Sequence, residues 1–347
     1  MSTPTEIVVH CGLHKTGSTA IQIGLAKYFE ACLEDGIYLY NGEGGNASHH
    51  ALAAKLFRNP KKSLALIDDV VENIRKYNKH TTFISSEDFQ SILTDPRSVR
   101  RFTQLLKTSG AEKVTYLIYL RNPIVYLTSM YLTLLFFKHS TPFSQYFETI
   151  LDTGHYKYAK WKLHFDYAEI SNALEEANVD FVFRDYHAMK DGNSVADVLD
   201  FLGHKHVSDA AQDDSRRGTT KNKGKFTKYC RYVLGDANIN AQMFKEFENT
   251  LADARLELPL ESKVKILERF ENSLAYVDKH HGTNILRATK ADIEKTQNST
   301  SDGEGFSYFD VFHETIAEDL NPVLADLNSP KRRATSVQLM KDWGWPV

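Results

Sequence analysis

The chain has 347 residues, of which 42% are hydrophobic and 25% are charged, a composition typical of soluble globular proteins. A formal net charge of −3 excludes a generally basic surface for nucleic acids or anionic membranes, so an anion site has to be a local concentration of donors. Three scattered cysteines, Cys11, Cys32 and Cys230, exclude a disulfide framework and predict buried thiols in a reducing compartment. The first residues lack the charged start and apolar segment of a signal peptide, so we expect a cytoplasmic protein.

Strand and helix patterns alternate in the first part of the chain. Ile7–Cys11 is a short β-branched run, typical of a parallel strand covered on both faces, and a helical pattern runs from Ser18 to near Asp35. The expected strands that follow are "IYLY", "TTFISSEDF", "VTYLIYL" and "VDFVFRDY", with helices between them. This alternation predicts an α/β fold with a mostly parallel, doubly wound sheet.

Residues 114–137 form the most apolar stretch, with a single charge. The sequence Arg-Asn-Pro lies in its middle, where a membrane helix would have to bury a cation and lose a backbone donor. A buried strand that ends at Leu120, followed by a helix that opens near Pro123, is therefore the better interpretation. We expect no membrane span.

Beyond about residue 205 the strand signal fades. Residues 213–225 form a polar and basic loop, "DDSRRGTTKNKGK", and residues 240–280 have a helical pattern that is interrupted at Pro259. We therefore expect an α/β core over residues 1–205 and a basic loop and helical extension over residues 206–347, packed on the same domain.

Three polar clusters follow expected strands, where ligands bind in open parallel sheets. They are "GLHKTGST", "SSEDF" and "RNP". In the first, a turn that runs into a helix leaves free backbone donors, and Gly12 and Gly17 allow close approach of the backbone. Ser18 and Thr19 add hydroxyl donors, so this segment predicts an anion site.

The lysine of this segment is displaced relative to a nucleoside-triphosphate loop. That loop has the pattern Gly-x4-Gly-Lys-Ser/Thr, whereas here Gly17 is followed by Ser18. Lys15 lies inside the loop instead, and we expect it to project towards the transferable end of the ligand. The displacement argues against a triphosphatase.

These segments resemble a known family. "GLHKTGSTAIQ" is similar to the 5′-phosphosulfate loop of sulfotransferases that use 3′-phosphoadenosine 5′-phosphosulfate (PAPS), and "YLIYLRNPIVYLTSMY" resembles their 3′-phosphate site. A weaker resemblance in "FVFRDYHAMKDGNSVADVLDFLG" extends the likeness over about residues 7–203. The His-Lys-Thr-Gly-Ser-Thr variant looks closer to bacterial carbohydrate-type members of this P-loop-like family than to the small-phenol enzymes.

The resemblance implies roles for individual residues. Lys15 stabilises the leaving phosphate, and the 5′ end of PAPS is held by Thr16, Gly17, Ser18 and Thr19. Arg121 and Ser129 bind the 3′-phosphate, and Arg121 has a structural ion pair as its alternative role. A sulfuryl group carries less negative charge than a phosphoryl group, so we expect no metal.

The acceptor hydroxyl also needs a base. Glu87, after a strand, is our first choice, and the carbohydrate members of the family use a strand-end glutamate in a similar way. His14 competes for this role, and His49 and His50 are candidates for the acceptor site. A helix cap or ion pair is the structural alternative for Glu87, as packing is for the histidines.

The basic loop contains a last candidate. Arg216, Arg217 and Gly218 faintly resemble the loop that sulfotransferases close over the 3′-phosphate. A solvated charged loop is the alternative interpretation, and the short match is as much a departure from the family as a likeness to it.

Together these patterns predict a PAPS-dependent O-sulfotransferase that acts on a hydroxyl group, on a saccharide or glycoconjugate, without a nucleic-acid partner. Two alternatives stay open. A kinase on a related fold predicts magnesium dependence, and a non-catalytic nucleotide-binding protein keeps the site without the chemistry.

Overall fold

The computed structural model describes part of the chain, in two compact units that we treat separately. It covers residues 6–40, 52–53, 60–136, 141, 143–159, 161–189, 193–204 and 258–298, without the side chains of 60–67, 132, 135 and 136. The described residues of the first unit lie within 6–122, 154–204 and 267–291, and those of the second within 123–153, 258–266 and 292–298.

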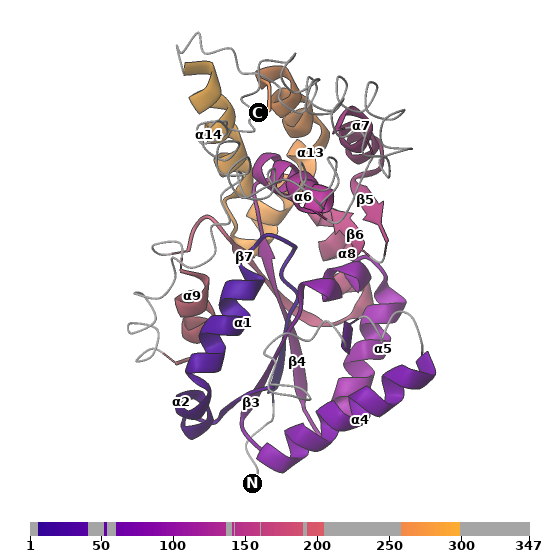
Figure 1. Cartoon of the computed structure of the whole chain (residues 1–347), viewed down its shortest axis with the longest axis vertical. Helices are drawn as coiled ribbons and strands as arrows, with labels where there is room; N and C mark the ends of the chain where they lie inside the picture. Colours follow the sequence, from indigo (N-terminus) through magenta and orange to yellow (C-terminus); the bar gives the residue numbers. More distant parts are fainter. Residues whose placement is uncertain are drawn as a thin grey trace, which may run out of the picture. The chain divides into compact units, whose positions relative to one another are not determined.

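The first unit is built on a five-stranded sheet in which every pairing is parallel (Figure 1). The strands are β1 (Glu6–His10), β2 (Ile37–Leu39), β3 (Thr81–Ser85), β4 (Lys113–Leu120) and β7 (Asp180–Asp185). Their order is β2-β3-β1-β4-β7, which confirms the α/β class and the parallel sheet and is compatible with a doubly wound fold.

The helices of this unit follow the strands in alternation. They are α1 (Ser18–Lys27), α2 (Phe29–Glu34), α4 (Pro60–Tyr77), the 3₁₀ helix η1 (Glu87–Ile92), α5 (Pro96–Lys107), α8 (Tyr167–Ala177) and α9 (Ser194–Phe201). The single helix expected over residues 18–35 is interrupted at Tyr28. A short antiparallel hairpin, β5 (His155–Tyr158) and β6 (Trp161–His164), lies outside the main sheet and was not predicted.

Both faces of the sheet are covered, as its apolar strands predict. Leu117 and Tyr119 of β4 share one buried cluster with apolar side chains of α1, α2 and α9. Tyr116, which directly precedes Leu117, points to the opposite face, where its hydroxyl lies 2.8 Å from Thr103 Oγ1 of α5. Because successive side chains of a strand point to opposite faces, β4 packs against helices on both faces of the sheet.

The apolar stretch over residues 114–137 is divided as expected. Strand β4 ends at Leu120 and helix α6 (Pro123–Phe136) begins three residues later, in the second unit. There α6 packs on α7 (Phe143–Thr153), and Tyr146 donates its hydroxyl hydrogen to the Leu127 carbonyl over 3.2 Å. Within the described ranges no helix has the length and apolarity needed to cross a bilayer.

Two helices near the end of the described chain, α13 (Leu260–His281) and α14 (Ile285–Asn298), run through both units. Helix α13 begins directly after Pro259, where the sequence predicts a break. In the second unit Lys263 of α13 is buried and pairs with Asp292 of α14 at 3.4 Å.

Strand order places the candidate site. The connection from β1 to β2 crosses one face of the sheet, and the connection from β3 to β4 crosses the other face. The segments that follow the neighbouring strands β1 and β3 therefore turn to opposite faces. A crevice forms outside the carboxyl ends of strands at such a switch point. The segments that begin there are the loop over residues 11–17 and the turn at Ser86–Glu87.

Candidate functional site

The loop between β1 and α1 presents the start of a helix that has no side-chain cap. Gly17 is the N-cap residue of α1 in a left-handed conformation, and the first helical bond runs from the Ile21 amide to the Gly17 carbonyl over 3.0 Å. The N–H groups of the first turn therefore have no acceptor within the helix, and the positive end of the helix dipole lies beside them. Thr16 stiffens the turn because its hydroxyl donates to the Leu13 carbonyl over 2.6 Å.

Two buried polar atoms face the inside of this loop. Ser18 Oγ and His10 Nε2 are both buried, and neither has a hydrogen-bond partner among the described residues. Both lie 2.7 Å from the point that a Cβ atom on Gly12 would occupy, so a side chain at Gly12 would fill the space that they share. Uncapped amides and buried donors form a set that fits an anionic group such as a phosphate or sulfate.

Lys15 occupies a strained position in the same loop. Its φ angle is 70°, which is uncommon for a residue other than glycine. The conformation is held from outside, since Arg121 Nη1 donates to the Lys15 carbonyl over 2.6 Å. Lys15 is half-buried, and its ammonium group forms no ion pair with another described residue. A cation of this kind is available to an incoming anion.

Arg121 and Ser129 were predicted to act together. Arg121 follows β4, and its guanidinium lies over the Tyr186 ring at 5.2 Å as well as on the Lys15 carbonyl. The structure therefore brings Arg121 to the loop, with a backbone contact that the sequence did not indicate. Ser129 lies on α6 in the second unit, where it is half-buried. Its pairing with Arg121 stays a prediction.

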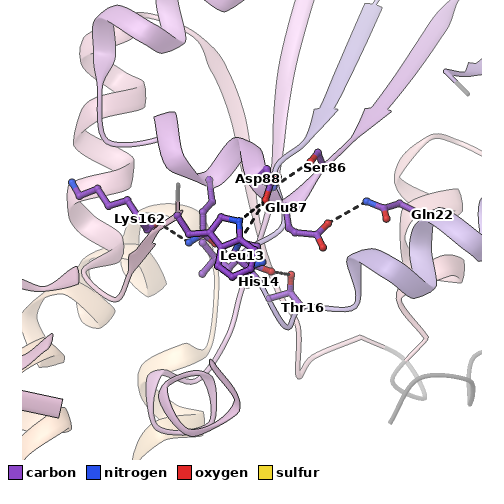
Figure 2. Close-up of polar contacts among 10 residues, drawn as sticks. Leu13, His14, Thr16, Gln22, Ser86, Glu87, Asp88 and Lys162 are labelled. Carbon is purple, nitrogen blue, oxygen red and sulfur yellow. Dashed lines mark hydrogen bonds and ion pairs between the residues drawn. The ribbon is translucent and has the colours of Figure 1, made fainter. Parts of the chain in front are cut away.

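Glu87 lies at the start of η1, two residues beyond β3 rather than on an extended segment. Ser86 caps this turn by accepting a hydrogen bond from the Asp88 amide, so Glu87 itself is not the N-cap. The Glu87 carboxylate is partly buried and accepts a hydrogen bond from Gln22 Nε2 of α1 at 3.3 Å (Figure 2). The candidate base therefore lies across from the helix that carries the anion loop.

His14 and Asp88 form a second group next to the loop. His14 Nε2 lies 3.9 Å from Asp88 Oδ1, and the imidazole packs on Trp161 with a centroid distance of 4.7 Å. Trp161 Nε1 donates to the same carboxylate oxygen over 2.8 Å. Asp88 follows Glu87 in the 3₁₀ turn, and its side chain points away from that of Glu87 (Figure 2). His14 is largely enclosed by these contacts.

The unpredicted hairpin is attached to the loop through Gln90 of η1. Its side chain accepts a hydrogen bond from the His14 amide over 2.9 Å and donates to the Lys162 carbonyl over 2.8 Å. Gln90 is fully buried, and its bond from the His14 amide is shielded from water. The Gln90 side chain of η1 therefore links the backbone of the loop to the backbone of the hairpin.

Some predicted residues cannot be placed. His49, His50, Arg217 and Gly218 lie outside the described residues, and the roles proposed for them stay predictions. Other residues at the site were not predicted, namely His10, Gln22, Ser85, Gln90 and Trp161. Gln22 and Ser85 lie within the segments "GLHKTGSTAIQ" and "SSEDF", and His10 is a polar residue in an apolar strand pattern, whereas Gln90 and Trp161 gave no signal.

No family model, no curated protein and no solved structure matches the chain.

Proposed function

We propose that the protein is a PAPS-dependent O-sulfotransferase with a P-loop-like core, which transfers a sulfuryl group to a hydroxyl on a saccharide or glycoconjugate. The observation that carries the proposal is the uncapped start of α1, with Lys15 in the loop and Glu87 at the neighbouring strand end. An enzyme of this type needs an anion cradle, a cation for the leaving oxygen and a base for the acceptor. The described residues supply one candidate for each.

The donor would be held mainly by backbone groups. The amides that open α1, with the hydroxyl of Ser18 and the exposed side chain of Thr19, would bind the 5′ phosphosulfate end. Arg121, already in contact with the Lys15 carbonyl, is the candidate for the 3′-phosphate, and in the proposal Ser129 assists it. When bound, PAPS supplies an activated sulfuryl group whose bond to the 5′-phosphate is the one that breaks.

The protein groups have separate tasks in a single displacement. Glu87 takes the proton of the acceptor hydroxyl as that oxygen bonds to sulfur, and the electron pair of the broken bond stays on the phosphate oxygen. Lys15 neutralises the charge that develops on this oxygen, and the loop amides act on the oxygens beside it. Gln22 fixes the Glu87 carboxylate by its hydrogen bond and limits the orientations that the base can take.

The proposal is tested by transfer from labelled PAPS. Purified protein is incubated with the donor and a panel of saccharides in the presence of EDTA, and labelled product is separated from donor. Sulfated saccharide in the wild type, with loss in Lys15→Ala and Glu87→Gln, is the expected result. Release of free sulfate alone, or transfer by both variants at the wild-type rate, would contradict the assigned chemistry.

A further inference from the structure

Lys15 has a backbone conformation that depends on the support of its carbonyl group. Its φ angle of 70° lies in the left-handed region, where the Cβ atom of a residue other than glycine is crowded by a carbonyl oxygen. Arg121 Nη1 holds the Lys15 carbonyl at 2.6 Å and so fixes the peptide plane between Lys15 and Thr16. Because the side chain leaves from the Cα atom beside this plane, the contact sets the base from which the ammonium group reaches out.

Arg121 is in turn held at its backbone by Tyr167 of α8, 46 positions further along the chain. The Tyr167 hydroxyl donates to the Arg121 carbonyl over 2.5 Å. Tyr167 is fully buried, and a buried hydroxyl group needs a hydrogen-bond partner. The backbone of Arg121 is therefore tied to the interior of the first unit, while its guanidinium reaches the loop.

The position of Tyr167 is set by the start of α8 and not by Arg121. Asp166 caps this helix start, and Ser273 of α13 donates to the same carboxylate over 2.7 Å. The Ser273 hydroxyl also accepts a hydrogen bond from the Ala168 amide over 2.9 Å. Tyr167 lies between Asp166 and Ala168, so both of its neighbours in the chain are fixed.

The Arg121 side chain has a second support in Tyr186, which follows β7. The guanidinium carbon lies 5.2 Å from the centre of the Tyr186 ring, within the range of a cation–π contact. The Tyr186 amide donates to the Leu120 carbonyl over 2.9 Å, so the pairing of β7 with β4 places this ring beside Arg121. The backbone and the side chain of Arg121 are thus fixed by two different tyrosines.

We infer that Tyr167 is a positioning residue for Lys15, which it supports through Arg121. The Tyr167 hydroxyl fixes the backbone of Arg121, the Arg121 guanidinium fixes the Lys15 carbonyl, and the Lys15 ammonium group is thereby held for the anion in the loop. A guanidinium carries five N–H donors in one plane, so its support of Lys15 is compatible with an anion on the same group. This role rests on the proposed function only for the identity of the anion.

A double-mutant cycle on the binding of inorganic pyrophosphate tests this role without any transfer reaction. In calorimetry, Lys15→Ala should weaken binding about tenfold, the lower range for a hydrogen bond to a charged group, and Tyr167→Phe about threefold, the lower range for a neutral hydrogen bond. Because Tyr167 acts through Lys15, adding Tyr167→Phe to Lys15→Ala should weaken binding no further. A general disturbance of the loop would weaken binding in both backgrounds.

Tyr116→Phe is the matched control. Tyr116 is fully buried in the same unit, and its hydroxyl lies 2.8 Å from Thr103 Oγ1 of α5. This substitution also removes one buried hydroxyl group, and the affinity for pyrophosphate should stay at the wild-type value. Urea unfolding of both phenylalanine variants should give cooperative transitions, so that the affinities refer to folded protein.

Kinetics give a second readout, since Lys15 acts on charge that develops in the transition state. With labelled PAPS, Tyr167→Phe should lower kcat about threefold and change KM less than that. Tyr116→Phe should leave both constants unchanged.

The outcomes distinguish this role from the proposed function. Additive losses in the cycle, or an equal loss of affinity in Tyr116→Phe, overturn the role of Tyr167 and leave the sulfotransferase proposal standing. Non-additive losses in a protein that never transfers sulfate support the role and remove the proposed activity. Pyrophosphate that does not bind, or that binds Lys15→Ala as tightly as the wild type, contradicts the role as stated.

Discussion

Two helix starts in the first unit, those of α1 and α9, differ in how their free amides are satisfied. At α9 the Asn193 side chain accepts hydrogen bonds from the amides of Val195 and Ala196, at 3.1 and 3.0 Å. At α1 the N-cap is Gly17, which has no side chain to accept a bond. One helix start is complete within the protein, whereas the other leaves its donors for a partner from outside.

The difference teaches where to look for a ligand. Helices α5 and α8 also start with a side-chain cap, Asp95 and Asp166, whereas the six-residue helix α2 has none at Tyr28. Among α1, α5, α8 and α9, only α1, at the switch point between β1 and β3, lacks a cap. An uncapped start combined with buried donors is the pattern that our proposal of an anion site requires.

The largest expected effect comes from removing the cation beside the uncapped start. Lys15→Ala should lower the rate of sulfuryl transfer by about 10² to 10³, the usual consequence of losing one preorganised charge-stabilising group. Lys27→Ala, an exposed lysine at the other end of α1, is the control. Initial rates with labelled PAPS measure both variants, and activity of Lys15→Ala within a few-fold of wild type would remove its catalytic role.

The next prediction compares the two helix starts by removing one side chain at each. Ser18→Ala should weaken anion binding by roughly 10- to 100-fold, the range for a hydrogen bond to a charged group, with little loss of stability because the hydroxyl has no described partner. Asn193→Ala should lower the free energy of unfolding by about 1 kcal/mol without changing anion affinity. Calorimetric titration and urea unfolding of both variants test the contrast, which fails if the two substitutions have the same profile.

A smaller effect is expected when a glycine with a positive φ angle is replaced by alanine, inside the loop or away from it. Gly17→Ala and Gly203→Ala both force alanine into a positive φ, at 82° and 83°, and should each cost about 1 kcal/mol of stability. At Gly17 the new methyl group also lies 2.9 Å from Ser194 Oγ, whereas nothing lies within 4 Å at Gly203. We therefore expect anion binding to fall only in Gly17→Ala, and equal affinities in the two variants would weaken the case for this loop.

A separate prediction, which needs no ligand, is a pH dependence of stability. Burial lowers the folded pKa of His10 to about 3 and that of His164 well below 6.5, so the unfolded chain binds more protons at each site. The free energy of unfolding should therefore fall as the pH drops below about 6.5, by up to roughly 1.4 kcal/mol per pH unit for each histidine that stays neutral in the folded protein. His164→Asn should remove one such contribution in urea titrations across this range. An unchanged slope would show that this histidine is not buried and neutral.

Much of the fold could be predicted because local patterns dictate it. The β-branched and apolar runs gave every strand of the main sheet, and Pro123 marked the start of α6. The glycines of the loop indicated a candidate anion site because turn conformation and backbone access are local properties. The position of Glu87 followed from its place after β3.

The rest depends on contacts between residues that are far apart in the chain. Trp161 binds Asp88 across 73 positions, and the hairpin that carries it has mixed polarity and only four residues in each strand. His10 becomes informative only when the register of β1 on β3 sets it opposite Ser85. The hydrophobic pattern of one strand does not indicate which residue of the neighbouring strand each of its residues will face.

The central claim, that the uncapped start of α1 binds a phosphosulfate nucleotide without metal, has one direct test. Thermal unfolding is measured with adenosine 3′,5′-bisphosphate in EDTA and, separately, with ATP and magnesium. The account predicts that the bisphosphate raises Tm by several degrees, since about 100 times Kd of ligand adds about 2.7 kcal/mol of stability. Stabilisation by ATP and magnesium alone would contradict the account and favour a kinase.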